Sequence, residues 1–325
     1  MKDLRALPKA HLHIHLEATL RPSTLAELAE AAGVPLPRTS GFTGFSEFST
    51  AYLSLLTVIN TPERLARLVD EAVEDAAAEG AVVIELATTP TFYTSIFGSI
   101  DAVIHHLCEY AEASAAKHGV WTGIVVAIDR TGGPESALDL AEAAARFAGR
   151  GVTGLGLHSE ERGFPARDFT RPFAVAREAG LLAVPHAGEL VGPESVREAV
   201  GLLGADRIQH GVRSIEDPAL VAELAASGTV LDVCPTSNLL LDVVPSLDVH
   251  PLPALLAAGV RCSINADDPT LFGVGLLDEY ETSRSILGLD DASLAACART
   301  SVQASAAPST IKADAEAAID RWLAN

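Results

Sequence analysis

The stretch Lys9-Ala10-His11-Leu12-His13-Ile14-His15-Leu16 decides how the rest of the chain is interpreted. It alternates histidine with an aliphatic residue, and alternate side chains of a β-strand point to opposite faces. A strand here therefore places three imidazoles on one face and three aliphatic side chains on the other. Each buried ring nitrogen needs a partner, and a divalent metal ion is a common one. A solvated, histidine-rich strand face is the alternative.

Short β-branched or apolar segments recur along the chain, and helical segments lie between them. Eight strands are predicted, at Ala10–Leu16, Val82–Ala87, Gly123–Ile128, Val152–Leu157, Leu181–Pro185, Asp206–Gln209, Thr229–Val233 and Val260–Ile264. Continuous apolar strands are typical of a parallel sheet that is covered on both faces. Several intervening helices begin at a proline and end at a glycine, namely Pro62 to Gly80, Pro172 to Gly180, Pro193 to Gly204 and Pro218 to Gly228.

This alternation predicts an α/β fold, a (β/α)8 TIM-type barrel that forms a single domain over residues 1–325. A doubly wound open sheet is the alternative, but no GxGxxG motif follows the first strand. The segment from residue 38 to 60 is longer than a usual loop and carries Phe42, Phe45, Phe48 and Tyr52. We expect it to be an inserted helical lid over the site; an extra helix packed by its own aromatic residues is the alternative.

Composition excludes several classes of partner. The formal net charge of −20 comes without a basic cluster, so neither nucleic acid nor an anionic membrane is an expected partner. No apolar run is long enough to span a membrane, and the first residues do not resemble a signal peptide. The four scattered cysteines indicate a reducing compartment. We therefore expect a cytoplasmic protein that acts on a small molecule.

Polar side chains follow four of the predicted strands. Strand ends converge at the carboxyl-terminal face of a barrel, so these side chains are expected to meet. Taken singly, each could be a core histidine, a helix cap or a turn residue. Together they predict a metal site. They are His13 and His15 after the first strand, His186 and Glu189 after the fifth, His210 after the sixth, and Asp267 and Asp268 after the eighth.

These motifs together resemble the adenosine deaminase branch of the metal-dependent amidohydrolases. The resemblance covers nearly the whole chain and includes Leu7-Pro8-Lys9, Ile84-Glu85-Leu86 and the stretch from Cys234 to Asn238. It implies a hydrolase that deaminates a 6-aminopurine with one Zn²⁺ per chain. The implied zinc ligands are His13, His15, His186 and Asp267.

The resemblance also implies roles for the remaining site residues. Glu189 matches the proton donor to purine N1, and His210 matches the residue that orients and deprotonates the zinc-bound water. Asp268 matches the carboxylate that meets purine N7. Ser159 occupies the place of a glycine whose backbone N–H is aimed at N3. Glu17 occupies the place where nucleoside deaminases usually have an Asp that reaches the ribose 5′-hydroxyl.

Three functions stay open at this point. We expect an adenine nucleoside as substrate, either adenosine or a 5′-extended one such as 6-aminodeoxyfutalosine, because residues 166–190 look most like that group. Free adenine is the alternative, since adenine deaminases of the family also carry Glu at the position of Glu17. A catalytically silent purine-binding barrel is weaker, because every expected catalytic position is filled. The sequence does not indicate an oligomeric state.

Overall fold

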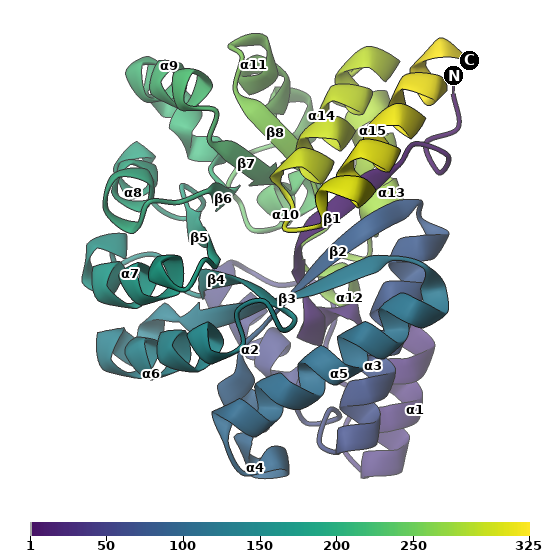
Figure 1. The fold of residues 1–325 in the computed structure, drawn as a ribbon, viewed down its shortest axis with the longest axis vertical. Helices are drawn as coiled ribbons and strands as arrows, with labels where there is room; N and C mark the ends of the chain where they lie inside the picture. The colour runs from purple at the N-terminus through teal and green to yellow at the C-terminus, as the bar shows by residue number, and fades with distance from the viewer. Residues whose placement is uncertain (1) are drawn as a thin grey trace.

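The computed structural model describes residues 2–325, and it contains the predicted barrel (Figure 1). Eight parallel strands follow one another around it in chain order. They are β1 Lys9–His15, β2 Ala81–Thr88, β3 Trp121–Asp129, β4 Val152–His158, β5 Leu182–Ala187, β6 Arg207–His210, β7 Val230–Val233 and β8 Arg261–Ile264. Each predicted strand is present within one or two residues of its predicted bounds.

Helices cover the outside of the barrel (Figure 1). They are α1 Pro22–Ala32, α2 Phe45–Leu55, α3 Pro62–Ala78, α4 Thr94–Phe97, α5 Ile100–His118, α6 Gly133–Arg146, α7 Thr170–Glu178, α8 Pro193–Glu198, α9 Pro218–Ser227, α10 Pro235–Leu240, α11 Leu252–Ala257, α12 Pro269–Phe272, α13 Leu276–Ser285, α14 Asp291–Ala304 and α15 Ser309–Ala324. Helix α3 begins as predicted, with Thr61 accepting a hydrogen bond from Arg64 N–H. Helix α7 begins two residues before Pro172, in a first turn where proline costs no helical hydrogen bond.

The barrel closes between β8 and β1 at the residues that form the site. The backbone of Asp267 exchanges two hydrogen bonds with β1, donating to His13 O at 3.1 Å and accepting from His15 N–H at 3.0 Å. Below them, the Asn265 side-chain oxygen accepts the N–H groups of Leu12 and His13. Closure therefore fixes the ends of two strands that carry predicted site residues and are about 250 residues apart in sequence.

A buried ionic network lies inside the barrel beneath the site. The guanidinium of Arg207 donates to Glu85 at 2.6 Å and to Asp232 at 2.9 Å, and all three side chains are almost fully buried. The other oxygen of Asp232 accepts from the Ser263 hydroxyl, which in turn accepts from Asn265. Because each charge has hydrogen-bonded partners, burial of this network is tolerated.

The inserted segment forms helix α2 at the carboxyl-terminal face. The ring of Phe48 stacks on Phe272 at a centroid distance of 5.3 Å, which ties α2 to α12, the short helix after β8. The Tyr52 hydroxyl donates to Glu17 at 2.7 Å and ties the same helix to the end of β1. The predicted helix is therefore present and covers the site. Its movement as a lid stays a prediction.

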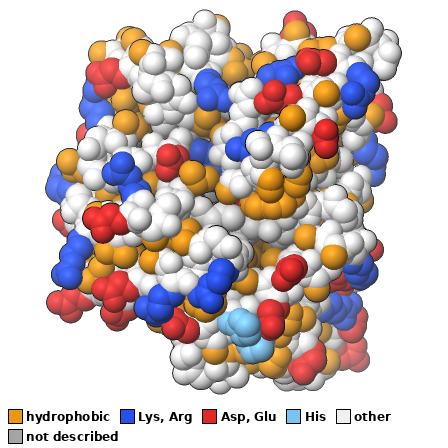
Figure 2. Space-filling view, viewed as in Figure 1, with side chains coloured by type: hydrophobic (Ala, Val, Ile, Leu, Met, Phe, Trp, Pro, Cys, Tyr) orange, Lys and Arg blue, Asp and Glu red, His pale blue; other side chains and the backbone are white. Residues whose placement is uncertain are grey.

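The exterior carries no continuous basic patch on the face shown in Figure 2, where Lys and Arg side chains are scattered among acidic ones. Within residues 2–325, no helix is both long and apolar enough to cross a bilayer. The two ends of the chain lie side by side (Figure 1), and Trp322 Nε1–H donates to Asp3 O at 2.7 Å.

Candidate active site

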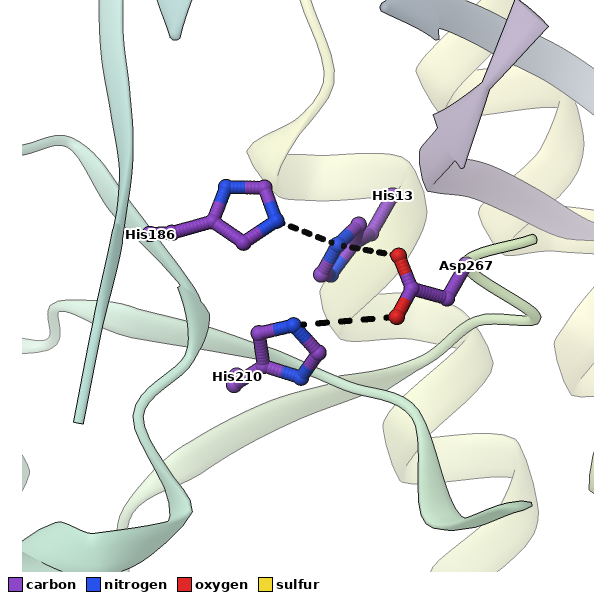
Figure 3. A group of neighbouring side chains, drawn as sticks. All are labelled: His13, His186, His210 and Asp267. Carbon is purple, nitrogen blue, oxygen red and sulfur yellow. Dashed lines mark hydrogen bonds and ion pairs between the residues drawn. The ribbon is translucent and has the colours of Figure 1, made fainter. Parts of the chain in front are cut away.

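Four side chains from four strand ends converge on one point (Figure 3). His13 Nε2 lies 3.2 Å from His186 Nε2 and 3.0 Å from Asp267 Oδ1. His15 Nε2 lies 3.1 Å from the same oxygen of Asp267. His210 Nε2 lies 3.7 Å from Asp267 Oδ2. The sequence prediction that these strand ends meet is therefore confirmed, and all five side chains are buried or nearly so.

Two overlapping groups of donor atoms could hold a metal ion. The ligand atoms of His13, His186, His210 and Asp267 lie within 4.8 Å of one another, and so do those of His15, Asp267 and Asp268. Imidazole and carboxylate are the donors that zinc prefers. His13 also has the correct tautomer for a ligand, because its Nδ1 faces the carbonyl oxygen of Asp232 at 3.0 Å. Nδ1 must donate there, so the lone pair lies on Nε2.

Backbone strain is concentrated at the site. Ser159, His210 and Asp267 have positive φ angles of 76°, 64° and 61°, in the left-handed region that favours glycine. Each such residue costs about 1–3 kcal/mol, and residues of this kind cluster at functional sites. His210 ends β6, Ser159 directly follows β4, and Asp267 lies three residues after β8, where the turn re-aims the side chain or backbone. Ser159 thus adopts the conformation expected of the glycine that it replaces.

The turn that carries Glu189 is held by one buried carboxylate. The two oxygens of Glu161 accept four backbone N–H groups, Oε1 also accepts the hydroxyl of Ser195, and Glu161 is 3% exposed. A carboxylate with this many donors is fixed in place. The backbone donors, at 2.7–3.2 Å, are Gly188, Glu189, Leu190 and Val191.

Burial sets the protonation of three site residues. It raises the pKa of the Glu189 carboxyl well above its ordinary value, and the negative charges of Asp267 and Glu161 add to this. Burial and the charge of Asp267 likewise raise the pKa of Asp268 well above its usual range. For His210, burial and then the neighbouring His13 lower the pKa to about 3. Burial therefore favours the neutral form of all three groups.

A cavity of about 90 Å³ opens beside these residues. Its floor includes His15, His186, Glu189, His210, Asp267 and Asp268, and Ser159 also lines it. Its rim is apolar and contains Phe45, Phe48, Leu53, Phe92 and Leu241. Helix α2 supplies the first three of these rim residues, so it forms one wall of the cavity.

Glu17 does not line this cavity. Its carboxylate is fully buried one layer behind Tyr52 and accepts three hydroxyl groups. The donors are Thr88 at 2.6 Å, Tyr52 at 2.7 Å and Tyr93 at 3.0 Å. The predicted contact of Glu17 with a substrate hydroxyl is therefore absent from this arrangement, because three protein hydroxyls already take up its oxygens.

Two buried residues at the site were not predicted. His158, at the end of β4, lines the cavity with its ring 4.5 Å from that of His186 and 4.6 Å from that of His15. Its ring fits because Gly156 has no Cβ; such an atom would lie 2.5 Å from His158 Nε2. Arg130, at the end of β3, donates to His186 O at 2.7 Å and so supports the fifth strand end. Both residues follow predicted strands, and their position at a strand end is the sequence feature that could have identified them as site residues.

His11 is buried below the site and takes no part in the metal cluster. Its Nε2 accepts the backbone N–H of Ala266 at 3.1 Å, which helps to close the barrel. The four cysteines are free; Cys108 is half-buried and the others are buried. Cys234 Sγ lies 3.3 Å from His13 Nδ1, but no cysteine belongs to either donor group among residues 2–325.

Comparison with known proteins agrees with this geometry. A family model described as adenosine deaminase matches residues 8–322. A Streptomyces coelicolor protein, named provisionally as an adenosine/adenine deaminase, is 41% identical over 338 residues, which cover 99% of this chain and 98% of that protein. The chain therefore belongs to the adenosine deaminase family and is a hydrolytic aminohydrolase.

Solved structures show the same fold. The adenine deaminase from Arthrobacter aurescens has a TM-score of 0.91 and 31% identity, and the match covers 98% of this chain and 99% of that one. A zinc-bound amidohydrolase from Burkholderia ambifaria has a TM-score of 0.87 and 26% identity, covering 99% and 94%. Both family and fold assign the chain to enzymes that act on adenine-like or adenosine-like substrates.

Proposed function

We propose that this enzyme uses one zinc ion per chain to replace the 6-amino group of adenine by oxygen, releasing ammonia. The observation that carries the proposal is the convergence of four imidazoles on the Asp267 carboxylate, beside Glu189, whose pKa burial raises, in a buried cavity. The proposed ligands are His13, His15, His186 and Asp267. The zinc-bound state of a related amidohydrolase supports the choice of metal.

The residues present fit a zinc ion. The tautomer of His13 leaves Nε2 free, and the Asp267 oxygen lies between the rings of His13 and His15. Zinc bound there would lower the pKa of a coordinated water to about 7 and make it a nucleophile at neutral pH.

The chain's own residues then handle the purine. Protonated Glu189 donates to a ring nitrogen, N1 in a 6-aminopurine, as C6 is attacked, so that the ring accepts the added electron pair. Asp268 Oδ1 is buried and has no partner within the protein, and it is placed to hydrogen-bond another ring nitrogen such as N7. The apolar rim limits contact with bulk water, and burial favours the neutral form of both acids.

Geometry favours the free base over the nucleoside expected from the sequence. Glu17, the expected partner of the ribose 5′-hydroxyl, is occupied by Thr88, Tyr52 and Tyr93. An adenine nucleoside is the second candidate, because the hydroxyls of Ser49 and Ser159 line the cavity and could meet a ribose.

Steady-state kinetics test the proposal. The zinc-loaded protein is assayed for ammonia release from adenine, adenosine and 6-aminodeoxyfutalosine, and its metal content is measured by elemental analysis. We expect one zinc per chain and the highest kcat/KM for adenine. A preference for either nucleoside would replace the first candidate by the second. Inactivity on all three substrates, or full activity without metal, would refute the function.

A further inference from the structure

A chain of hydrogen bonds that starts at a backbone amide fixes the proton of His210. The Leu252 N–H, at the start of α11, donates to Nδ1 of His250 at 3.1 Å. A backbone amide is always a donor, so this ring nitrogen carries a lone pair. The one proton of the His250 imidazole is therefore on Nε2, and that nitrogen can only donate.

The Asn238 side chain links His250 to His210, so the direction of the first hydrogen bond fixes the direction of the next. His250 Nε2 lies 3.1 Å from Asn238 Oδ1, which must be the carbonyl oxygen because it faces a donor. The Asn238 amide nitrogen then faces the other way, 3.1 Å from Nδ1 of His210. An amide nitrogen only donates, so Nδ1 of His210 carries a lone pair and its proton is on Nε2. The three side chains are at most 4% exposed, so bulk water does not compete.

We infer that His210 presents an N–H, not a lone pair, to the attacking water, and that Asn238 and His250 are positioning residues that hold it in this tautomer. Two carboxyl oxygens lie on that side, Glu189 Oε1 at 3.6 Å and Asp267 Oδ2 at 3.7 Å from Nε2, and neither is within hydrogen-bond distance. This reverses the hydrogen-bond direction implied by the family resemblance, in which His210 deprotonates the water. The inference rests on the proposed function only for the identity of the reacting oxygen.

Two consequences follow for the site. An imidazole whose Nδ1 accepts and whose Nε2 carries the proton has no lone pair for a metal, so His210 is not a ligand. That separates it from His13, whose Nδ1 donates to Asp232 O and leaves Nε2 free. In addition, an N–H aimed at the attacking oxygen favours the hydroxide form of that water and orients the oxygen towards the purine. Removal of a preorganised hydrogen-bond donor of this kind typically lowers kcat by about 10²–10³-fold.

Nitrogen NMR of the ¹⁵N-histidine-labelled protein tests the tautomer directly, in the metal-free and the zinc-loaded state. His210 is assigned from the signal lost in His210→Gln. We expect a proton on Nε2 and none on Nδ1 in both states. A proton on Nδ1, or Nε2 bound to zinc, would overturn the inference. This measurement needs no turnover, so it stays decisive even if all three candidate substrates prove inactive.

Asn238→Asp tests the functional consequence. Its carboxylate accepts from both neighbouring rings, so the proton of His210 should move to Nδ1 and leave a lone pair on Nε2. We expect kcat to fall by about 10²–10³-fold, with zinc content unchanged. The exposed Asn60→Asp is the matched control and should keep wild-type kcat and tautomer. An Asn238→Asp enzyme that has lost the Nε2 proton yet keeps wild-type kcat would refute the donor role.

Discussion

The Glu161 carboxylate accepts the backbone N–H of Glu189 at 3.2 Å, and three neighbouring amides of the same turn donate to it as well. The residue that we propose as the proton donor is therefore held by a second carboxylate from another strand end. This contact fixes the position of Glu189, and the charge of Glu161 helps to keep it protonated.

Glu161→Gln should weaken catalysis without removing the metal. The Gln amide nitrogen would face backbone N–H groups, and a buried unsatisfied donor costs about 1–3 kcal/mol. We expect a lower melting temperature, a kcat reduced by roughly tenfold or more as the Glu189 turn loosens, and unchanged zinc content. Glu160→Gln is the matched control, because Glu160 lies next in sequence and pairs with the exposed Arg162. Equal kcat in both variants would show that Glu161 does not position Glu189.

Glu189→Gln should keep the zinc and lose most of the rate. Loss of a general acid lowers kcat by about 10²–10⁴-fold. Because Glu189 acts in its protonated form, wild-type kcat should fall as pH rises through its raised pKa. The kcat of Glu189→Gln should not show this fall with rising pH. Glu194→Gln, on α8, is the control. Near-wild-type turnover in Glu189→Gln would mean that another group supplies the proton.

Asp267 and Asp268 should have different roles, metal binding and purine binding, although they are adjacent. Asp267 Oδ1 contacts His13 and His15, whereas Asp268 Oδ1 has no partner within the protein. Asp267→Ala should therefore lose zinc, and Asp268→Ala should keep zinc and lose turnover or affinity for the purine. Zinc titration followed by steady-state kinetics distinguishes the two. The same loss of metal in both variants would contradict this division.

The sequence predicts the barrel and the meeting of these histidine and aspartate side chains because both depend on local patterns. Alternation in β1 identifies the face that carries His13 and His15, and the position of a residue at a strand end places it at one rim. Topology alone then brings His186 and Asp267 to the same point. No detail of packing is needed for this step, so the predicted ligands converge as expected.

Side-chain direction could not be predicted in the same way. Glu17 turns away from the cavity because hydroxyls from β2, the segment after it and α2 reach it, and these lie 35–76 residues further along the chain. The tautomer of His210 likewise depends on Asn238 and on a backbone N–H beyond His250. Such contacts carry no periodic signal. They emerge only once the elements are packed.

The buried Glu279, on α13, should make stability fall as pH rises from about 4.5 to about 8. Burial raises its pKa to about 8, so the folded state holds a proton that the unfolded chain releases near its ordinary value of 4.5. The stabilisation is complete below pH 4.5 and is lost as pH rises through about 8. Glu279→Gln should therefore raise the melting temperature at pH 9 more than at pH 5. The exposed Glu281→Gln should leave the melting temperature unchanged at both pH values. An equal effect of Glu279→Gln at pH 9 and pH 5 would contradict the prediction.

Nucleoside monophosphates should be poor substrates. Within residues 2–325, no Lys or Arg side chain lines the cavity, whereas the carboxyl groups of Asp129, Glu189, Asp267 and Asp268 do. A phosphate carries a charge of about −1.5 to −2 at pH 7 and is usually bound by Arg or Lys.

We expect kcat/KM for AMP to be roughly 10²-fold or more below that for the better of adenine and adenosine, since an unpaired phosphate loses about 3 kcal/mol or more of binding. Ser49→Arg, on the cavity side of α2, should narrow this gap by pairing with the phosphate, and added salt should weaken that gain. Ser46→Arg places the same charge on α2 outside this cavity and should leave the ratio unchanged. Wild-type turnover of AMP at the rate of adenine would show that the acidic cavity does not exclude nucleotides.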